Sequence, residues 1–116
     1  MDINVARHAH NIAHISLVGK LDPYATQQMG DRFRAETAGQ DGSVIVDLSA
    51  VTFVTSLGIG LIIDCADAVQ KRGHRMVLIP PGGHADEVFR KTGVYRIVPT
   101  AGSVDEAIDI AAGKGT

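Results

Sequence analysis

The sequence has few of the residues that build disulfide frameworks, zinc sites or nucleic-acid surfaces. Only one of its 116 residues is cysteine, Cys65, which excludes an internal disulfide and a cysteine-rich zinc site. The 11 basic and 13 acidic side chains leave a net charge of −2. Nucleic-acid-binding proteins normally carry a basic patch, so we expect no nucleic acid among the partners.

Long apolar runs are also missing. The longest, residues 57–63, ends at Asp64 and is far shorter than the roughly 20 residues that cross a bilayer. The first residues contain no apolar segment of the kind found in signal peptides. We therefore expect no membrane insertion and a cytoplasmic location.

Recognised catalytic and cofactor motifs are absent as well. The sequence has no nucleophile elbow, no phosphate-binding loop and no dinucleotide-binding glycine pattern. The histidines lack the spacing of a metal pair on a helix; they are His8, His10, His14, His74 and His84. We therefore expect no catalytic residue, no metal and no cofactor, with Cys65 as an inert core thiol.

Hydrophobic periodicity predicts one α/β domain over residues 1–116, a size typical of one compact domain. The expected strands lie around residues 3–5, over 12–19, 44–48 and Met76–Ile79, and over 94–98 as a short edge strand. The first two are joined by a turn so short that they must be antiparallel. The β-branched run at 44–48 is typical of a buried parallel strand, and we expect Phe53 to follow it in the core.

Helices alternate with these strands. The first begins at Pro23 with Asp22 as its N-cap, and we expect Tyr24, Met29 and Phe33 to point inward. The others are expected over residues 55–72, 85–92 and 104–112. Gly93 is expected as a left-handed cap just after the third helix, and Ser103 with Glu106 as a capping box that opens the fourth. The order predicts a mixed, mostly parallel sheet of four to five strands with an N-terminal antiparallel hairpin, flanked by about four helices.

Residues 51–60 are the segment most informative about function. A short extended piece is followed by Ser56, in the first turn of the longest predicted helix. One interpretation is that Thr55 or Ser56 is only an N-cap, which contributes about 1 kcal/mol to stability. Position alone favours this interpretation.

Two glycines in the same helix point to another role. Gly58 and Gly60 each cost roughly 1 kcal/mol relative to alanine, and glycine lets another backbone approach closely. Leu57 and Ile59 add apolar character there, and a flat, partly apolar helix start is typical of a docking surface. Alternatively, the glycines pack against a neighbouring helix of the same domain.

Several short motifs occur together along nearly the whole chain. They are GKLD at 19–22, VDLS-x-V-x-F at 46–53, S-x-GIG at 56–60, TGV at 92–94 and EA at 106–107. In this order and spacing the chain resembles the STAS domain family. Within it, the chain is most similar to the bacterial anti-sigma factor antagonists of the stage II sporulation AA type, which implies a STAS-like fold.

The resemblance also implies a phosphorylation switch. In that family the serine matching Ser56 is phosphorylated by a serine kinase with the histidine-kinase-like ATPase fold, which is also the anti-sigma factor. The unphosphorylated protein binds this kinase and frees a sigma factor, and a PP2C-type phosphatase restores the binding form. Thr55 stands where the family usually has aspartate and Leu57 where a small residue is common, and Thr55 is the alternative acceptor.

The expected partner-binding residues are Asp22, Thr55, Ser56, Leu57, Gly58, Ile59 and Gly60. Two other functions remain open at this point. The chain could be a STAS scaffold that is never phosphorylated, in a stress-signalling complex or as the partner of a lipid-transport ATPase. It could also be an enzyme with Ser56 as nucleophile, although no histidine base stands at a recognisable spacing.

Overall fold

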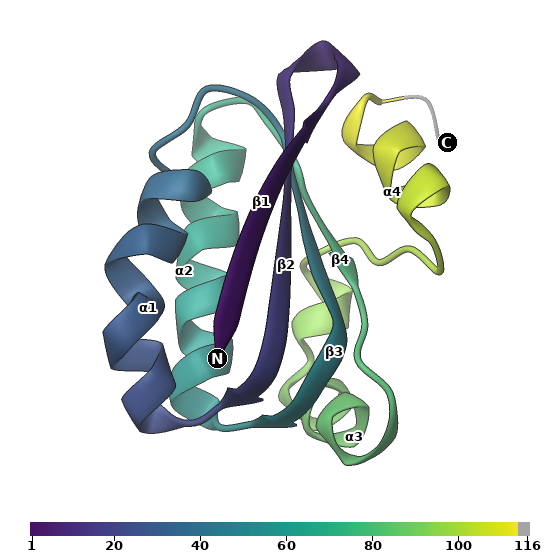
Figure 1. Ribbon diagram of the computed structural model, residues 1–116. Helices are drawn as coiled ribbons and strands as arrows, with labels where there is room; N and C mark the ends of the chain where they lie inside the picture. Colours follow the sequence, from purple (N-terminus) through teal and green to yellow (C-terminus); the bar gives the residue numbers. More distant parts are fainter. Residues whose placement is uncertain (114–116) are drawn as a thin grey trace.

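The computed structural model describes residues 1–113 and shows a four-stranded sheet with helices on both faces (Figure 1). The strands are β1 (Asp2–His8), β2 (Ile12–Leu21), β3 (Val44–Val54) and β4 (Met76–Ile79). The helices are α1 (Pro23–Glu36), α2 (Ser56–Lys71), α3 (Gly83–Thr92) and α4 (Val104–Ala111). Residues 114–116, which the predicted domain also includes, lie outside the described part.

The strands lie side by side in chain order, from β1 to β4. The pair β1–β2 is antiparallel and the other two pairs are parallel. This confirms the predicted mixed sheet with an N-terminal hairpin. Because parallel strands finish at the same edge, β2 and β3 bring their carboxyl ends, and the helices that follow them, to one end of the molecule.

Two hydrophobic clusters hold the layers together. The larger one lies between the sheet and helices α1, α2 and α3, and includes Phe33 and Ile62. The smaller one lies on the other face, where Ile45 and Val77 pack against Ala107 of α4. Strands β3 and β4 therefore have apolar residues on both faces, which explains why their sequences read as continuous apolar runs.

The expectation that Phe53 lies in the core is wrong, because its exposed fraction is 39%. Gly19 of β2 pairs with Val51, but the next residue, Lys20, pairs with Phe53. One residue of β3 is therefore extra at this point. Counted from the buried Val51, simple alternation would bury Phe53. The extra residue exchanges the two faces of the strand, and so Val54 is buried instead.

Tyr24 is also exposed, by 71%, whereas the predicted inward positions of Met29 and Phe33 are confirmed. Ala25, Met29 and Phe33 form the buried stripe of α1 at intervals of four residues. Successive helical residues are about 100° apart. Tyr24 therefore lies beside this stripe and points away from the core.

No strand forms over residues 94–98. A turn of 3-10 helix, Val94–Arg96, follows Gly93, whose φ of 76° ends α3 in the left-handed region. The N–H groups of this turn bond to nearby carbonyls rather than to the sheet. The segment reaches the sheet a few residues later, through one isolated parallel bridge between Thr100 and Leu78, so the described sheet has four strands.

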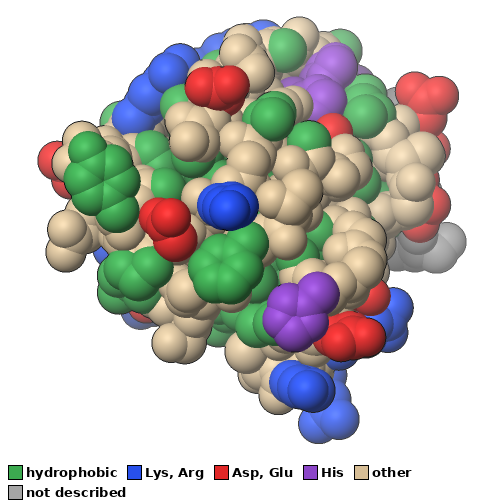
Figure 2. All heavy atoms as spheres, turned by 60° about the horizontal axis from the view of Figure 1, so that its bottom comes forward, with side chains coloured by type: hydrophobic (Ala, Val, Ile, Leu, Met, Phe, Trp, Pro, Cys, Tyr) green, Lys and Arg blue, Asp and Glu red, His purple; other side chains and the backbone are tan. Residues whose placement is uncertain are grey.

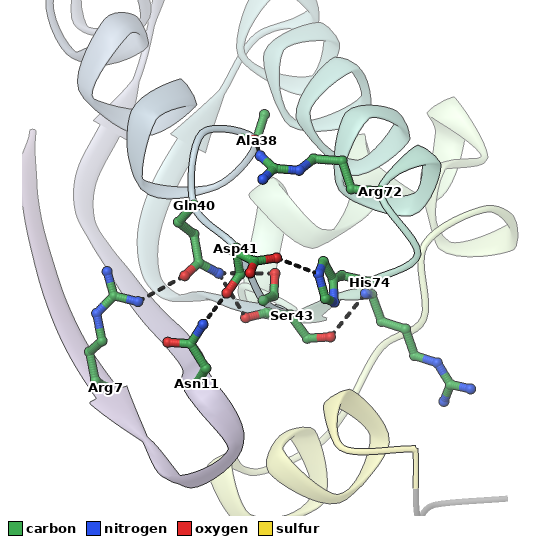
Figure 3. Close-up of polar contacts among 10 residues, drawn as sticks. Arg7, Asn11, Ala38, Gln40, Asp41, Ser43, Arg72 and His74 are labelled. Carbon is green, nitrogen blue, oxygen red and sulfur yellow. Dashed lines mark hydrogen bonds and ion pairs between the residues drawn. The ribbon is translucent and has the colours of Figure 1, made fainter.

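The end of the molecule near the β1–β2 turn is tied together by polar contacts between loops (Figure 3). His74 Nε2 lies 3.0 Å from Asp41 Oδ1, and the backbone N–H of Arg75 donates to Ser43 Oγ at 3.0 Å. These contacts join the loop before β3 to the loop before β4. The opposite end, where α1 and α2 begin, is built differently.

Candidate functional site

The candidate site lies where β2 and β3 end and α1 and α2 begin. Leu21 closes β2 and leads into Asp22, and Val54 closes β3 and leads into Thr55. Figure 2 shows this end of the molecule, with apolar side chains on the surface among a few charged ones. The chain order of strand and helix thus places most of the predicted partner-binding residues at one end.

Asp22 caps α1, as the sequence predicts. Its Oδ1 accepts a hydrogen bond from the N–H of Ala25 at 2.8 Å, and Pro23 occupies the first turn. The backbone carbonyl of Asp22 also accepts from the hydroxyl of Thr26 at 2.8 Å. The start of α1 is therefore closed by its own chain.

Thr55 occupies the corresponding position before α2, but its side chain does not cap the helix. Its hydroxyl donates instead to the carbonyl of Leu21 at 3.4 Å, and its backbone N–H donates to the same oxygen at 3.2 Å. Thr55 is half-buried and ties the start of α2 to the end of β2. The interpretation that Thr55 or Ser56 serves only as an N-cap has no support in these hydrogen bonds.

Ser56 is the first residue of α2 and is exposed. Leu57 beside it is 49% exposed. The first N–H groups of a helix have no partner within the helix, and no side chain of the described residues caps α2. The hydroxyl of Ser56 is therefore accessible at the positive end of the helix dipole.

The two glycines of α2 lie in different surroundings. A Cβ at Gly58 would stand 2.6 Å from Leu21 Cγ, whereas a Cβ at Gly60 would meet nothing within 4 Å. Gly58 thus packs inside the domain, against the end of strand β2. The expectation that the glycines pack against a neighbouring helix is wrong for Gly58. Ile59, only 2% exposed, lies in the core. No neighbour within the domain requires a glycine at position 60. The missing side chain of Gly60 instead lowers the outer surface of the helix.

Two exposed aromatic residues belong to this end of the molecule, and the sequence analysis did not predict them as part of the site. Tyr24 follows Asp22 in the first turn of α1, and Phe53 lies two residues before Thr55. Both were assigned to the core. The spacing of the buried residues in α1 is the signal that could have placed Tyr24 outside; the extra residue in β3 left no mark in the sequence.

The ionisable groups with shifted pKa values lie elsewhere and serve the fold. Burial raises the pKa of the Cys65 thiol. Hydrogen bonds from Arg90 and Tyr95 lower the pKa of Asp86 on α3. Within residues 1–113 no group of three or more histidine, cysteine or acidic side chains is placed to hold a metal, and none of the helices has the length and apolar content of a membrane span.

Comparisons with known proteins agree on the type of domain. A family model described as STAS domain matches residues 4–107, whereas no curated protein matches the sequence. An anti-sigma factor antagonist from Mycobacterium paratuberculosis superposes with a TM-score of 0.84 at 20% identity, covering 96% of this chain and 93% of that one.

Two similar structures carry the name SpoIIAA, one described as an anti-sigma factor antagonist and the other as a cell fate determinant. The first, an unphosphorylated form, has a TM-score of 0.79 at 22% identity, with 97% of both chains covered. The second, a phosphorylated form from Bacillus, has a TM-score of 0.69 at 24% identity, covering 94% of this chain and 98% of that one. At these identities the likeness shows the fold.

Proposed function

The chain belongs to the STAS domain family, and from this premise we propose that it is an anti-sigma factor antagonist controlled by phosphorylation of Ser56. The unphosphorylated form binds an anti-sigma factor that is also a serine kinase with the histidine-kinase-like ATPase fold, and so frees a sigma factor. Phosphorylation abolishes this binding, and a PP2C-type phosphatase restores it. The observation that carries the proposal is the exposed Ser56 hydroxyl at the uncapped start of α2.

Ser56 is a better acceptor than Thr55. A kinase must reach the hydroxyl oxygen with the terminal phosphate of ATP, which requires an exposed side chain. Thr55 is half-buried and its hydroxyl is engaged with the Leu21 carbonyl, whereas Ser56 is exposed. We therefore assign the phosphate to Ser56.

The surface around Ser56 fits a protein partner. Leu57, Phe53 and Tyr24 are 49%, 39% and 71% exposed, and exposed apolar side chains grouped at one place mark interaction sites. Gly60 leaves the next turn of α2 open to a partner's backbone. Gly58 and Ile59 support this surface from beneath, and Asp22 holds the start of α1 beside it.

The proposed switch follows from charge. A phosphate adds about −1.5 to −2 charges at pH 7. At the start of a helix it gains roughly 0.3–1 kcal/mol from the dipole and the free N–H groups, so the fold should tolerate it. A misplaced charge inside a docked interface costs about 2–5 kcal/mol, or roughly 30- to several-thousand-fold in affinity. The loss of binding outweighs the local gain several times.

The relatives are consistent with a binding domain. SpoIIAA has been solved in a phosphorylated and an unphosphorylated form, and both are similar to this chain. The family fold is in general that of a non-enzymatic binding domain. We therefore place the chemistry of phosphate transfer on the partner rather than on Ser56 as a nucleophile.

The test uses a candidate anti-sigma factor kinase with the histidine-kinase-like ATPase fold from the same organism. The protein is incubated with the kinase and ATP, and the modified residue is located by mass spectrometry. We expect one phosphate on the wild type and on Thr55→Ala, and none on Ser56→Ala. A phosphate on Thr55, or no phosphate with the complex intact, would sink the assignment; the second result would favour the unphosphorylated scaffold.

Affinity is then measured by calorimetry with the purified phosphorylated and unphosphorylated proteins. We expect at least a 30-fold weaker complex for the phosphorylated protein, at the lower bound of the estimate above. Ser56→Ala, which changes the side chain but adds no charge, is the matched control and should bind like the wild type. Equal affinity of the two protein forms would contradict the switch.

A further inference from the structure

The two edges of the sheet are finished differently. At the outer edge of β4, the N–H of Leu78 donates to Pro99 and its carbonyl accepts from Ala101, both at 2.9 Å. The chain after α3 thus covers that edge. β1 is the other edge strand, and no described segment pairs with its outer side; in Figure 1 it lies uncovered in front of the sheet.

β1 lacks most of the features that protect an exposed edge. Natural edge strands are kept from pairing by short length, bulges, proline, charged side chains (lysine above all) or a covering segment. All seven residues of β1 pair with β2 in one uninterrupted register, from Asp2 opposite Val18 to His8 opposite Ile12. The strand contains no proline and no lysine. Its charged residues are Asp2 at one end and Arg7 near the other, and Arg7 donates to Gln40 Oε1 of the same chain at 2.8 Å.

The strand also has apolar side chains that remain half-covered. Ile3 and Val5 pack against the larger hydrophobic cluster but are only partly buried. They lie on the same face of β1, two residues apart, at the rim of the core. Another strand added at this edge would cover both side chains further.

We propose that β1 is a self-association surface, at which the β1 strands of two copies pair antiparallel around a two-fold axis at Val5. Opposite residues of an antiparallel pair share a face of the sheet. With Val5 opposite its own copy, Ile3 lies opposite Arg7 and Asp2 lies opposite His8. Because the pairing is symmetric, each of these contacts occurs twice, once with each copy supplying either residue.

This register is selected by the Asp2 side chain. The symmetric pairing places each Asp2 carboxylate, a hydrogen-bond acceptor, beside an imidazole, which carries an N–H donor in either tautomer. This happens twice in one contact. Moving the axis by one residue, to Asn4, puts Asp2 opposite Ala6, and moving it to Ala6 leaves Asp2 beyond the paired segment. The register at Val5 is therefore the one of these three in which Asp2 faces a base.

His8 is positioned to receive such a carboxylate. Its Nε2 lies 3.0 Å from His14 Nδ1, and the two rings stack with centroids 5.2 Å apart. The His14 ring lies between His8 and Asp47, with its Nε2 3.7 Å from Asp47 Oδ2. This row holds the His8 ring through its Nε2. In the proposed pair, its other ring nitrogen, Nδ1, would face Asp2 of the second copy.

The proposal adds a second surface to the molecule and does not depend on the switch at Ser56. Because the paired strands run in opposite directions, the two Ser56 ends point away from each other. Both remain free to bind a partner. A contact through one strand is small, so we expect a weak and reversible dimer.

Disulfide cross-linking tests the register. Opposite residues have Cβ atoms about 4.5–5.5 Å apart, close to the range of disulfides, so Val5→Cys should form a covalent dimer on mild oxidation. Ile3→Cys is the matched control on the same face. In this register the two copies of Ile3 stand four residues apart along the strand, roughly 13 Å, and should not cross-link.

The native Cys65 is buried and should form no disulfide between copies in either variant. Circular dichroism checks that each variant is folded. A dimer formed by Val5→Cys alone supports the proposal. Equal cross-linking of the two variants, or none in either, would overturn it.

Charge exchange gives a second, independent measurement. In analytical ultracentrifugation, Asp2→Lys should weaken the dimer about fivefold, because lysine then faces His8 in both pairs. The double variant Asp2→Lys with His8→Asp should recover the wild-type dimer. Glu87→Lys, an equal charge change on α3, should have no effect. A wild type that stays monomeric at every concentration, or a double variant no better than Asp2→Lys, would overturn the proposal.

Discussion

Helices α1 and α2 begin at the same end of the sheet, yet their first turns are completed in different ways. Asp22 caps α1 with its carboxylate, and Pro23 follows it in the first turn. The residue at the same place before α2, Thr55, turns its hydroxyl to Leu21 instead. One helix start is closed by a side-chain cap, whereas the other is anchored by its backbone, has no side-chain cap and leaves Ser56 exposed.

The largest expected effect on stability comes from Gly58, at which α2 packs against the end of β2. Gly58→Ala would place a Cβ 2.6 Å from Leu21 Cγ and 3.2 Å from its carbonyl oxygen. Overpacking of this kind costs about 1–3 kcal/mol, so the free energy of unfolding in urea should fall by that amount. An unchanged midpoint would mean that the start of α2 is not held as tightly against β2 as the contact indicates.

Removing the cap of α1 should cost less. Asp22→Ala deletes the acceptor of the Ala25 N–H and should lower the free energy of unfolding by about 1 kcal/mol. Asp22→Asn keeps a side-chain oxygen and is the control, with most of the stability retained. If the alanine and asparagine variants melt alike, the cap is not what stabilises this helix start.

Gly60→Ala should change stability in the opposite direction to Gly58→Ala. Nothing lies within 4 Å of its added Cβ, and alanine is favoured over glycine in a helix by about 0.8–1 kcal/mol. Thermal denaturation should therefore show a modest gain in stability. Calorimetry with the anti-sigma kinase should show weaker binding, and a more stable variant that binds normally would remove Gly60 from the proposed surface.

The smallest effect is expected at Thr55. Thr55→Ala deletes a hydroxyl that caps nothing, and Leu21 keeps its hydrogen bond from the backbone N–H of residue 55 at 3.2 Å. The free energy of unfolding should change by less than about 0.5 kcal/mol. A loss as large as that of Asp22→Ala would show that the two helix starts are alike after all.

Local signals in the sequence predicted much of the architecture. Strand β4 was predicted with the bounds that it has, and Gly93 takes the left-handed conformation expected after α3. Ser103 caps α4, with its hydroxyl oxygen accepting from the N–H of Glu106 at 3.2 Å. Each of these features depends on residues within a few positions of one another.

The candidate site was predicted less completely. The sequence indicated Ser56 and the glycines of α2 but assigned Tyr24 and Phe53 to the core, although both are exposed. The position of Phe53 depends on an extra residue in the pairing of β3 with β2. That pairing joins residues more than 30 positions apart, beyond the range of periodicity arguments.

The amino-acid sequence by itself determined the alternation of strands and helices, the caps at Asp22 and Ser103, and the segment that carries Ser56, because these follow from local hydrogen bonding and periodicity. Only the tertiary structure decided that Leu21 occupies the space beside Gly58, whereas the space beside Gly60 is empty. It also decided that the outer edge of β4 is covered, while no segment within residues 1–113 pairs with the outer edge of β1. These differences arise when distant segments meet, and two identical residues in one helix then receive opposite surroundings.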